Sequence, residues 1–403
     1  MKKRLFIFLG IGLIVSVLVA GPFMGGFVNA AEPKTLKIGV IAWLGWGLGV
    51  QFVDGSKLYA DIINKKDGLE IGGEKYKIKL LVEDSKMNSA TAKAAAEKLV
   101  YQDKVQFIVG DETVDAWLPV TEQNKVLVVA GTPSPAMLSP NYKYCFQATA
   151  ITSQMQEICG WFAANYPDKK TLVFVAPDFR PGHLEAEKAE KIDQVYGWKI
   201  LDEIFYPMEA TDISAAATKI KSLNPDMLMF DVGGPVREGL NWKAAREAGY
   251  TGQFLSPNSA TTNSLMSAGV AALEGYIGGV YALETERTAV AREFKAAYVA
   301  VKGKWDDPDT LFTNTFYLLV AALKKANSLN TDKVAETIAK GMEFESPNGT
   351  CKTTSRPDVG NSRAVDIVIA LGIKRIEDGQ NKVIHQMSID EAYGYLKKYY
   401  GWK

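Results

Sequence analysis

"VQFIVGDETVDAWLPVTEQNKVLVVAGTPSP", residues 105–135, is the stretch of this sequence that decides the fold. Apolar runs at 105–109 and 126–130 flank a helical segment, and a turn rich in Gly, Thr, Pro and Ser closes the stretch. Continuous runs of Val, Ile and Leu are typical of parallel strands that are buried on both faces of a sheet. The stretch therefore predicts a strand–helix–strand unit of an α/β protein.

The same order of elements recurs in "DMLMFDVGGPVREGLNWKAAREAGYTGQFLSPNSA", residues 226–260. An apolar strand at 227–230 leads into a glycine pair and a helical segment, and a polar turn follows at 256–259. The two stretches share the order of their predicted elements but are not a sequence repeat. They predict equivalent units in two similar lobes.

The rest of the chain alternates in the same way between short apolar runs and helical periodicity. A crossover strand is predicted at 274–283. The last part of the chain predicts β-structure at 346–357 and 365–373, a turn at Asp378-Gly379 and an aromatic closing segment at 393–402. The other predicted strands are 36–42, 76–83, 171–175 and 200–206, and the predicted helices include 90–100, 184–196, 213–223, 290–301 and 312–323.

Length and charge limit the kind of partner. The chain has 403 residues, enough for two domains, and its 46 basic residues equal its 46 acidic residues. A protein that binds nucleic acid usually carries a basic patch or a basic net charge. The composition therefore favours a small molecule as the partner and excludes nucleic acid.

The first thirty residues have the layout of a secretory signal. Lys2, Lys3 and Arg4 precede an apolar stretch at 5–20, and small residues lead up to Ala30. This order predicts a signal peptide at 1–30 with cleavage after Ala30, and a mature protein in the periplasm. A retained anchor is the alternative, although the apolar stretch is short for a membrane span.

Neither metal nor catalytic chemistry is indicated. The two histidines are far apart in the sequence, and no CxxC, P-loop or G-x-S-x-G motif occurs. We expect no metal, no cofactor and no enzyme activity. The chain has three cysteines, Cys145, Cys159 and Cys351, and an exported protein would carry them into an oxidising compartment. Two alternatives are open: one disulfide bond with one free thiol left over, or three buried thiols without a disulfide.

The glycines in "IGVIAWLGWGLGV", residues 38–50, do not form a dinucleotide fingerprint. The third glycine comes one position too early for G-x-G-x-x-G, and Asp61 falls inside the following helix. A nucleotide-dependent enzyme is therefore a remote alternative. Trp43 and Trp46 follow the first strand, where ligands of parallel sheets bind, and their indoles can stack on a ligand or pack against their own lobe.

Five stretches together resemble the periplasmic leucine/isoleucine/valine-binding protein family of ABC-importer receptors. They are "LKIGVIAWLG", "DGSKLYADIINKKDG", residues 105–138, "FLSPNSATTNSL" and "EGYIGGVYAL". The resemblance implies a type I periplasmic binding protein: two Rossmann-like α/β lobes with parallel sheets, joined by three crossover hinge strands and closing on a ligand. It also implies a membrane permease as partner, and we expect a monomer. The implied lobes are 31–148 with 281–347 for the first, and 149–280 with 348–403 for the second.

Three positions correspond to groups that hold an α-amino acid in this family. The carboxylate partners correspond to Val114, or a neighbour within "ETVDA", and to Ser134 near Thr132, and the acidic partner of the ammonium corresponds to Asn258. Two of these three residues differ from the polar or acidic residues that the family has at those positions. Burying an ammonium group without a counter-charge is costly, so a standard α-amino acid is not favoured as the ligand.

Other residues at predicted cleft loops suggest a different ligand. Arg180 beside Phe179 can pair with a carboxylate, Asp231 can replace the missing acid, and Gly234 permits close approach. Each of them is equally open to a plain surface or turn role. The set favours a small amphipathic acid, with aromatic acids among the candidates, and leaves a branched-chain or other amino acid as the alternative.

Overall fold

The computed structural model describes residues 32–402, apart from 46, 112, 133, 150–152, 179, 208–209, 211, 231–234, 260–264, 266–268, 307 and 309. The predicted signal peptide and its cleavage site lie outside the described residues. Among the residues described, no helix is long and apolar enough to cross a membrane.

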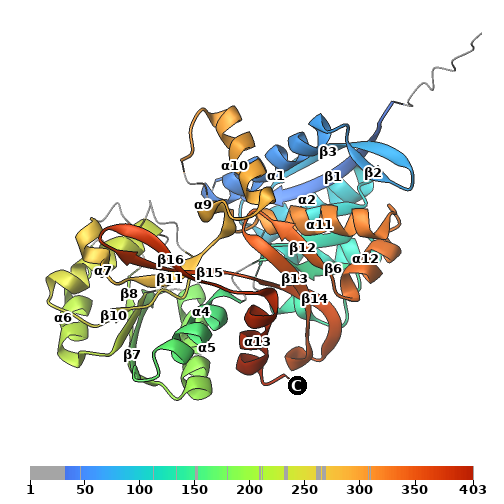
Figure 1. Ribbon diagram of the computed structural model, residues 1–403. Coiled ribbons are helices and arrows are strands. Elements are labelled where there is room, and N and C mark those ends of the chain that lie inside the picture. The colour runs from blue at the N-terminus through green and yellow to red at the C-terminus, as the bar shows by residue number, and fades with distance from the viewer. Residues whose placement is uncertain are drawn as a thin grey trace, which may run out of the picture. The chain divides into compact units, whose positions relative to one another are not determined.

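The first sheet has six strands, and Figure 1 shows it in blue to green. Their order is β2 (Leu69–Ile71), β3 (Glu74–Asp84), β1 (Lys34–Ala42), β4 (Phe107–Gly110), β5 (Leu127–Ala130) and β6 (Cys145–Gln147). All neighbours are parallel except β2 and β3, which form an antiparallel pair. The strands β4, β5 and β6 are buried at every residue, which explains their continuous apolar sequences.

Helices from two parts of the chain pack around this sheet. The early part supplies α1 (Gly47–Lys65), α2 (Ser89–Glu97) with its π-helical continuation η1 (Lys98–Gln102), η2 (Val114–Ala116), α3 (Leu118–Gln123) and η3 (Pro135–Leu138). A later part supplies α10 (Ala289–Lys302), α11 (Thr313–Ala326) and α12 (Thr331–Ala339). Helix α11 contacts α1, β4 and β5, so a segment far along the chain completes the first core.

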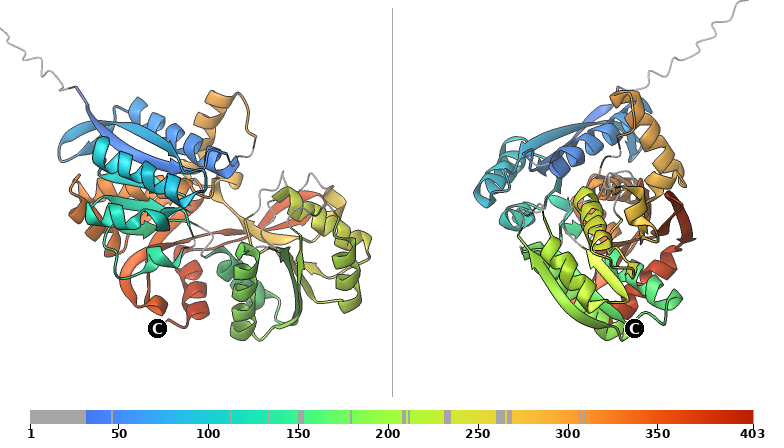
Figure 2. Two further views of the ribbon diagram at one scale, coloured as in Figure 1. Left: turned by 180° about the vertical axis from the view of Figure 1, so that it is seen from behind. Right: turned by 90° about the vertical axis from the view of Figure 1, so that its left-hand side faces the viewer.

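The second sheet has the order β10 (Gln253–Phe254), β9 (Met227–Phe230), β7 (Thr171–Pro177) and β8 (Lys199–Tyr206), and every pair is parallel. Its helices are α4 (Gln154–Asn165), α5 (Arg180–Tyr196), α6 (Ser214–Leu223) and α7 (Pro235–Glu247), and η5 (Val270–Leu273) follows them; Figure 2 shows this part in green and yellow. The predicted equivalence of the two units is confirmed, because β4–α3–β5 and β9–α7–β10 have the same parallel topology.

Two antiparallel sheets complete the fold. One joins β11 (Ile277–Val280), β15 (Gly372–Glu377) and β16 (Gln380–Gln386), and the other joins β12 (Glu343–Ser346), β13 (Gly349–Arg356) and β14 (Asn361–Ile369). The strand β11 also bridges to Leu255 beside β10, whereas β14 contacts β6 and η3. The first group of elements is the six-stranded sheet with its helices and the sheet β12–β13–β14, and the second group is the four-stranded sheet with its helices and the sheet β11–β15–β16. The chain passes between these two groups three times: from β6 to α4, from β11 to α9 (Ala282–Thr285), and from β14 to β15.

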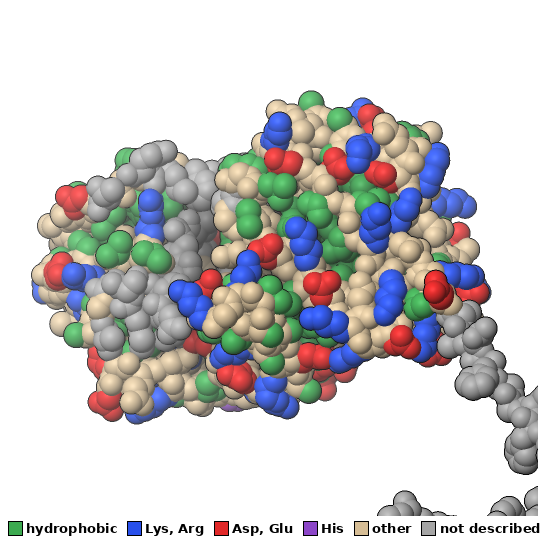
Figure 3. All heavy atoms as spheres, turned by 90° about the horizontal axis from the view of Figure 1, so that it is seen from above, with side chains coloured by type: hydrophobic (Ala, Val, Ile, Leu, Met, Phe, Trp, Pro, Cys, Tyr) green, Lys and Arg blue, Asp and Glu red, His purple; other side chains and the backbone are tan. Residues whose placement is uncertain are grey.

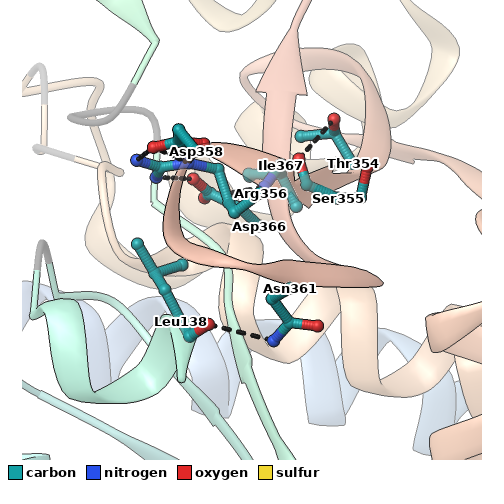
Figure 4. A network of polar contacts seen from close by, with 8 residues as sticks. All are labelled: Leu138, Thr354, Ser355, Arg356, Asp358, Asn361, Asp366 and Ile367. Carbon is teal, nitrogen blue, oxygen red and sulfur yellow. Dashed lines mark hydrogen bonds and ion pairs between the residues drawn. The ribbon is translucent and has the colours of Figure 1, made fainter. Parts of the chain in front are cut away.

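The β13–β14 hairpin is fastened to the first group by side chains. Asn361 Nδ2 donates to the carbonyl of Leu138 in η3 at 2.9 Å, as Figure 4 shows. In the same view Arg356 lies between Asp358 and Asp366, with N···O distances of 2.8 and 2.9 Å. The turn η6 (Pro357–Val359) and helix α13 (Ile389–Tyr400) follow in this region, and Arg356 stacks on Tyr400 of α13.

The division of the chain into lobes at the predicted boundaries stays a prediction. The strands β13 and β14 both contact α12, and β14 also contacts β6, whereas α13 contacts α4 and α5 as well as β14. The predicted turn is confirmed, because Asp378 and Gly379 have φ values of 52° and 71° and join β15 to β16.

The three cysteines are all described, all buried, and none forms a disulfide bond. The alternative of buried thiols therefore holds. Burial raises the pKa of the Cys145 and Cys351 thiols to about 12. In the part of the chain that the structure covers, no three His, Cys, Asp or Glu side chains are grouped to hold a metal ion.

Candidate functional site

The carboxyl ends of β1, β3 and β4 are tied together by a polar network. The Ser85 amide donates to the carbonyl of Ala42 at 3.0 Å, and its hydroxyl donates to Asp111 Oδ2 at 2.7 Å. The other oxygen of Asp111 accepts the amide of Thr113 at 2.9 Å, and only 4% of Asp111 is exposed. This network fixes the loop that follows β4 at the edge where ligands of parallel sheets bind.

The glycines after β1 make room for the protein's own Trp43. A Cβ atom at Gly49 would lie 2.0 Å from the carbonyl oxygen of Trp43, and one at Gly45 would lie 2.7 Å from its indole Nε1. Position 47 has no such restriction. The close approach that these glycines permit is therefore used to fold Trp43 back onto the start of α1. Trp43 is half-buried, and its contact with a ligand stays a prediction.

Thr132 and Ser134 follow β5 and are nearly buried. The Ser134 hydroxyl caps η3 by accepting the Ala136 amide at 3.1 Å, and it donates its proton to Asp115. The Thr132 hydroxyl accepts the Ser134 amide at 3.2 Å, a bond that does not use its own proton. Of the two predicted residues, Thr132 therefore has the better hydroxyl for donation to a carboxylate.

Val114, the first residue of η2, is buried. Its side chain is 0% exposed and belongs to a hydrophobic cluster that includes Trp117 and Leu118. A ligand contact by Val114 stays a prediction, which this burial does not favour. Within this segment the exposed polar group is Asp115, which holds Ser134.

In the second group of elements, Asn258 follows β10. Its amide donates to Ser256 Oγ at 3.2 Å, and its carbonyl accepts the amide of Gly279 in β11 at 3.0 Å. The next amide, that of Ser259, donates to Gln154 Oε1 at 2.7 Å. Segment 256–259 is therefore fixed to both β11 and α4 through its backbone. A ligand contact by the half-buried Asn258 side chain stays a prediction.

A buried carboxyl that sequence reasoning missed lies beside this segment. Glu238, in the first turn of α7, is 7% exposed, and its Oε1 accepts the Trp242 indole N–H and the Tyr276 hydroxyl, each at 3.2 Å. Burial raises the pKa of Glu238 to about 7, against hydrogen bonds from Ser256, Trp242 and Tyr276. The available signal was the pair of Glu238 and Trp242, four residues apart in the helical segment that follows the glycine pair.

The other predicted site residues are described only in part. Trp46, Phe179, Asp231 and Gly234 lie outside the described residues, and Arg180 is described only as the first residue of α5. His183, three residues further on, is exposed and pairs with Asp178 at 2.9 Å. Seen from above, the molecule intersperses basic and acidic side chains, in keeping with its balanced composition (Figure 3).

Sequence comparison agrees with this architecture. The periplasmic binding protein family matches residues 35–369, most of the chain, and the protein belongs to that family. Its members are extracytoplasmic solute-binding receptors, and the sheets described above give this chain their type I fold.

Three relatives illustrate the range of the family. An amino acid binding protein from Pseudomonas aeruginosa is 27% identical over 303 residues, which cover 72% of this chain and 77% of the relative. A leucine binding protein from Thermotoga maritima shares the fold with a TM-score of 0.65, 22% identity, and coverage of 88% and 99%. A solute binding protein from Rhodopseudomonas palustris in complex with 3,4-dihydroxybenzoic acid has a TM-score of 0.65, 23% identity, and coverage of 88% and 98%.

Proposed function

We propose that this chain is the solute-binding receptor of an ABC importer and that it closes its two lobes on a small amphipathic acid. One observation carries the proposal: the polar segments that follow β5 and β10 occupy equivalent places in two units of the same topology. A ligand that touches both segments would favour the closed form, because only contacts absent from the open form shift the equilibrium. Delivery to a membrane permease follows from the class.

The chemistry of the site supports an acid. The Thr132 hydroxyl can donate to a carboxylate, Arg180 at the start of α5 can pair with it, and Trp43 offers an apolar face. Asn258 carries an amide and cannot neutralise an ammonium group. The aromatic acid in the relative from R. palustris is an example of such a ligand in this fold.

A branched-chain or other amino acid is the second candidate. The relatives from P. aeruginosa and T. maritima are named for amino acid and leucine binding. Asp231 would then supply the counter-charge that Asn258 lacks. We further propose that residues 1–30 are removed on export, that the mature chain is periplasmic and monomeric, and that it performs no catalysis.

A thermal-shift screen of the mature protein tests the function. The panel contains benzoate, 3,4-dihydroxybenzoate, short aliphatic acids, leucine, isoleucine and valine. A ligand at 100 times its Kd stabilises the native state by about 2.7 kcal/mol, so we expect a clear rise in Tm with at least one acid. A rise with leucine or valine alone would select the amino-acid alternative, and no rise with any compound would contradict the proposed function.

A further inference from the structure

Glu238 gathers donors from three separate segments of the chain. Trp242 belongs to α7 itself, Ser256 follows β10, and Tyr276 directly precedes β11. Ser256, Trp242 and Tyr276 are each 0% exposed. A carboxylate is an acceptor only, and its two oxygens can satisfy three such donors at once.

One of these donors leads directly to the predicted ligand contact. The Ser256 hydroxyl is hydrogen-bonded to Glu238 and to Tyr276, and it accepts the Asn258 amide at 3.2 Å. Tyr276 continues into β11, where Gly279 donates to the Asn258 carbonyl at 3.0 Å. Glu238 therefore supports the backbone of Asn258 from both sides, through Ser256 and through the strand that begins after Tyr276.

We propose that Glu238 is a positioning residue for ligand binding, which acts by holding segment 256–259 in place without touching the ligand. The inference rests on the proposed function, because it gives Asn258 a role in the site. Gln at this position would keep one acceptor oxygen and replace the other with an N–H₂ group. If the Gln oxygen keeps the bonds from Trp242 and Tyr276, the N–H₂ group faces the Ser256 hydroxyl, which must then accept instead of donate.

The charges around Glu238 come from neighbouring elements. Lys374 of β15 is 0% exposed, and its Nζ lies 3.3 Å from Oε2 of Glu284 in α9. Its positive charge favours the ionised form of Glu238. Tyr276 is the titratable group in direct contact, and burial raises its pKa well above the ordinary value. The ionised form of Glu238 matches the donors, whereas a protonated carboxyl would present one more donor to them. Burial favours the protonated form and the donors favour the ionised form, so the hold on segment 256–259 depends on the charge of Glu238.

The experiment compares Glu238→Gln with Glu247→Gln, the same change at an exposed residue in the last turn of the same helix. The probes are 3,4-dihydroxybenzoate and leucine, with affinities measured by calorimetry between pH 5.5 and 8.5. For the probe that binds the wild type, we expect Glu238→Gln to weaken binding about tenfold or more at pH 8, a loss of about 1.4 kcal/mol. The wild-type affinity should change between pH 5.5 and 8.5, and that of Glu238→Gln should be flat. Glu247→Gln should match the wild type in both respects.

A second measurement needs no ligand and separates the inference from the proposed function. Hydrogen exchange of the ligand-free protein should be faster at the Asn258 and Ser259 amides in Glu238→Gln, and unchanged in Glu247→Gln. If neither probe binds the wild type, the proposed function loses support while hydrogen exchange still decides the inference. Should Glu238→Gln fail to fold, Ser256→Ala is expected to give the same two effects. A folded variant with wild-type affinity, pH profile and exchange would overturn the proposal.

Discussion

The segments that follow β5 and β10 occupy equivalent places in their units, yet they are held by different chemistry. After β5, hydroxyl groups and the exposed Asp115 carboxylate hold Thr132 and Ser134. After β10, a buried carboxyl on α7 holds Ser256. The comparison teaches that shared topology fixes where the segment after a strand lies, whereas local side chains decide how firmly and at what pH that segment is held.

The glycine loop of the first unit should show the largest effect. Gly49→Ala would place a Cβ atom 2.0 Å from a backbone oxygen, so the loop or α1 must move. We expect a loss of about 3 kcal/mol in the free energy of unfolding, the upper range for overpacking. Chemical denaturation measures it, with Gly47→Ala, which meets nothing within 4 Å, as control. Equal stability of the two variants would contradict the proposed use of the loop.

The pH dependence of stability should come from the second unit. The pKa of Glu238 is raised from 4.5 to about 7, so the folded state binds more protons than the unfolded state between these values. The contribution of Glu238 to stability should therefore fall as pH rises from 4.5 to above 7, by up to about 3 kcal/mol. Glu238→Gln should be destabilised relative to the wild type more strongly at pH 5 than at pH 8. Denaturation at both pH values measures this, and a constant difference would count against it.

A pair of buried tryptophans sharpens the same contrast. Trp117 and Trp242 are both 0% exposed, but Trp242 donates to Glu238, whereas the Trp117 indole N–H has no acceptor among the described residues. We expect Trp242→Phe to cost about 1–2 kcal/mol more than Trp117→Phe, because it leaves a buried carboxyl short of a donor. Urea unfolding of the two variants provides the comparison. Equal losses of unfolding free energy in the two variants would show that the lost side-chain volume, and not the hydrogen bond to Glu238, determines the cost.

The hydroxyls after β5 should show the smallest effects. Ser134→Ala removes a cap and should cost about 1 kcal/mol of stability, with little change in ligand affinity. Thr132→Val removes the acceptor of the Ser134 amide, so we expect a comparable loss of about 1 kcal/mol of stability, and binding of an acid should weaken about tenfold. Thermal unfolding and calorimetry with the probe that binds the wild type distinguish the two roles. The reverse pattern would assign the carboxylate to Ser134.

Much of the fold could be predicted from local sequence. The strands β4, β5 and β9 are continuous apolar runs, and burial on both faces requires such runs. Helix α12 was not predicted, although Asn330 caps it by accepting the Lys333 amide, a pattern that its sequence offered.

The site was less accessible to sequence reasoning. The order of the strands along the sequence was enough to predict that the turn residues Thr132, Ser134 and Asn258 follow strands. Glu238 reads as an ordinary helical residue, and its role depends on Ser256 and Tyr276, which only the tertiary fold brings to it. Val114 was assigned by position, and burial among apolar neighbours could not be inferred from its place in a loop.

The buried thiols have a practical consequence for studying lobe closure. All three cysteines are enclosed, and a thiol with a pKa near 12 is almost entirely protonated at neutral pH and reacts slowly. A single cysteine introduced on the surface of each lobe would therefore be the preferred target of a maleimide dye. The native sequence already suits paired fluorescent labels, whose separation would report opening and closing directly.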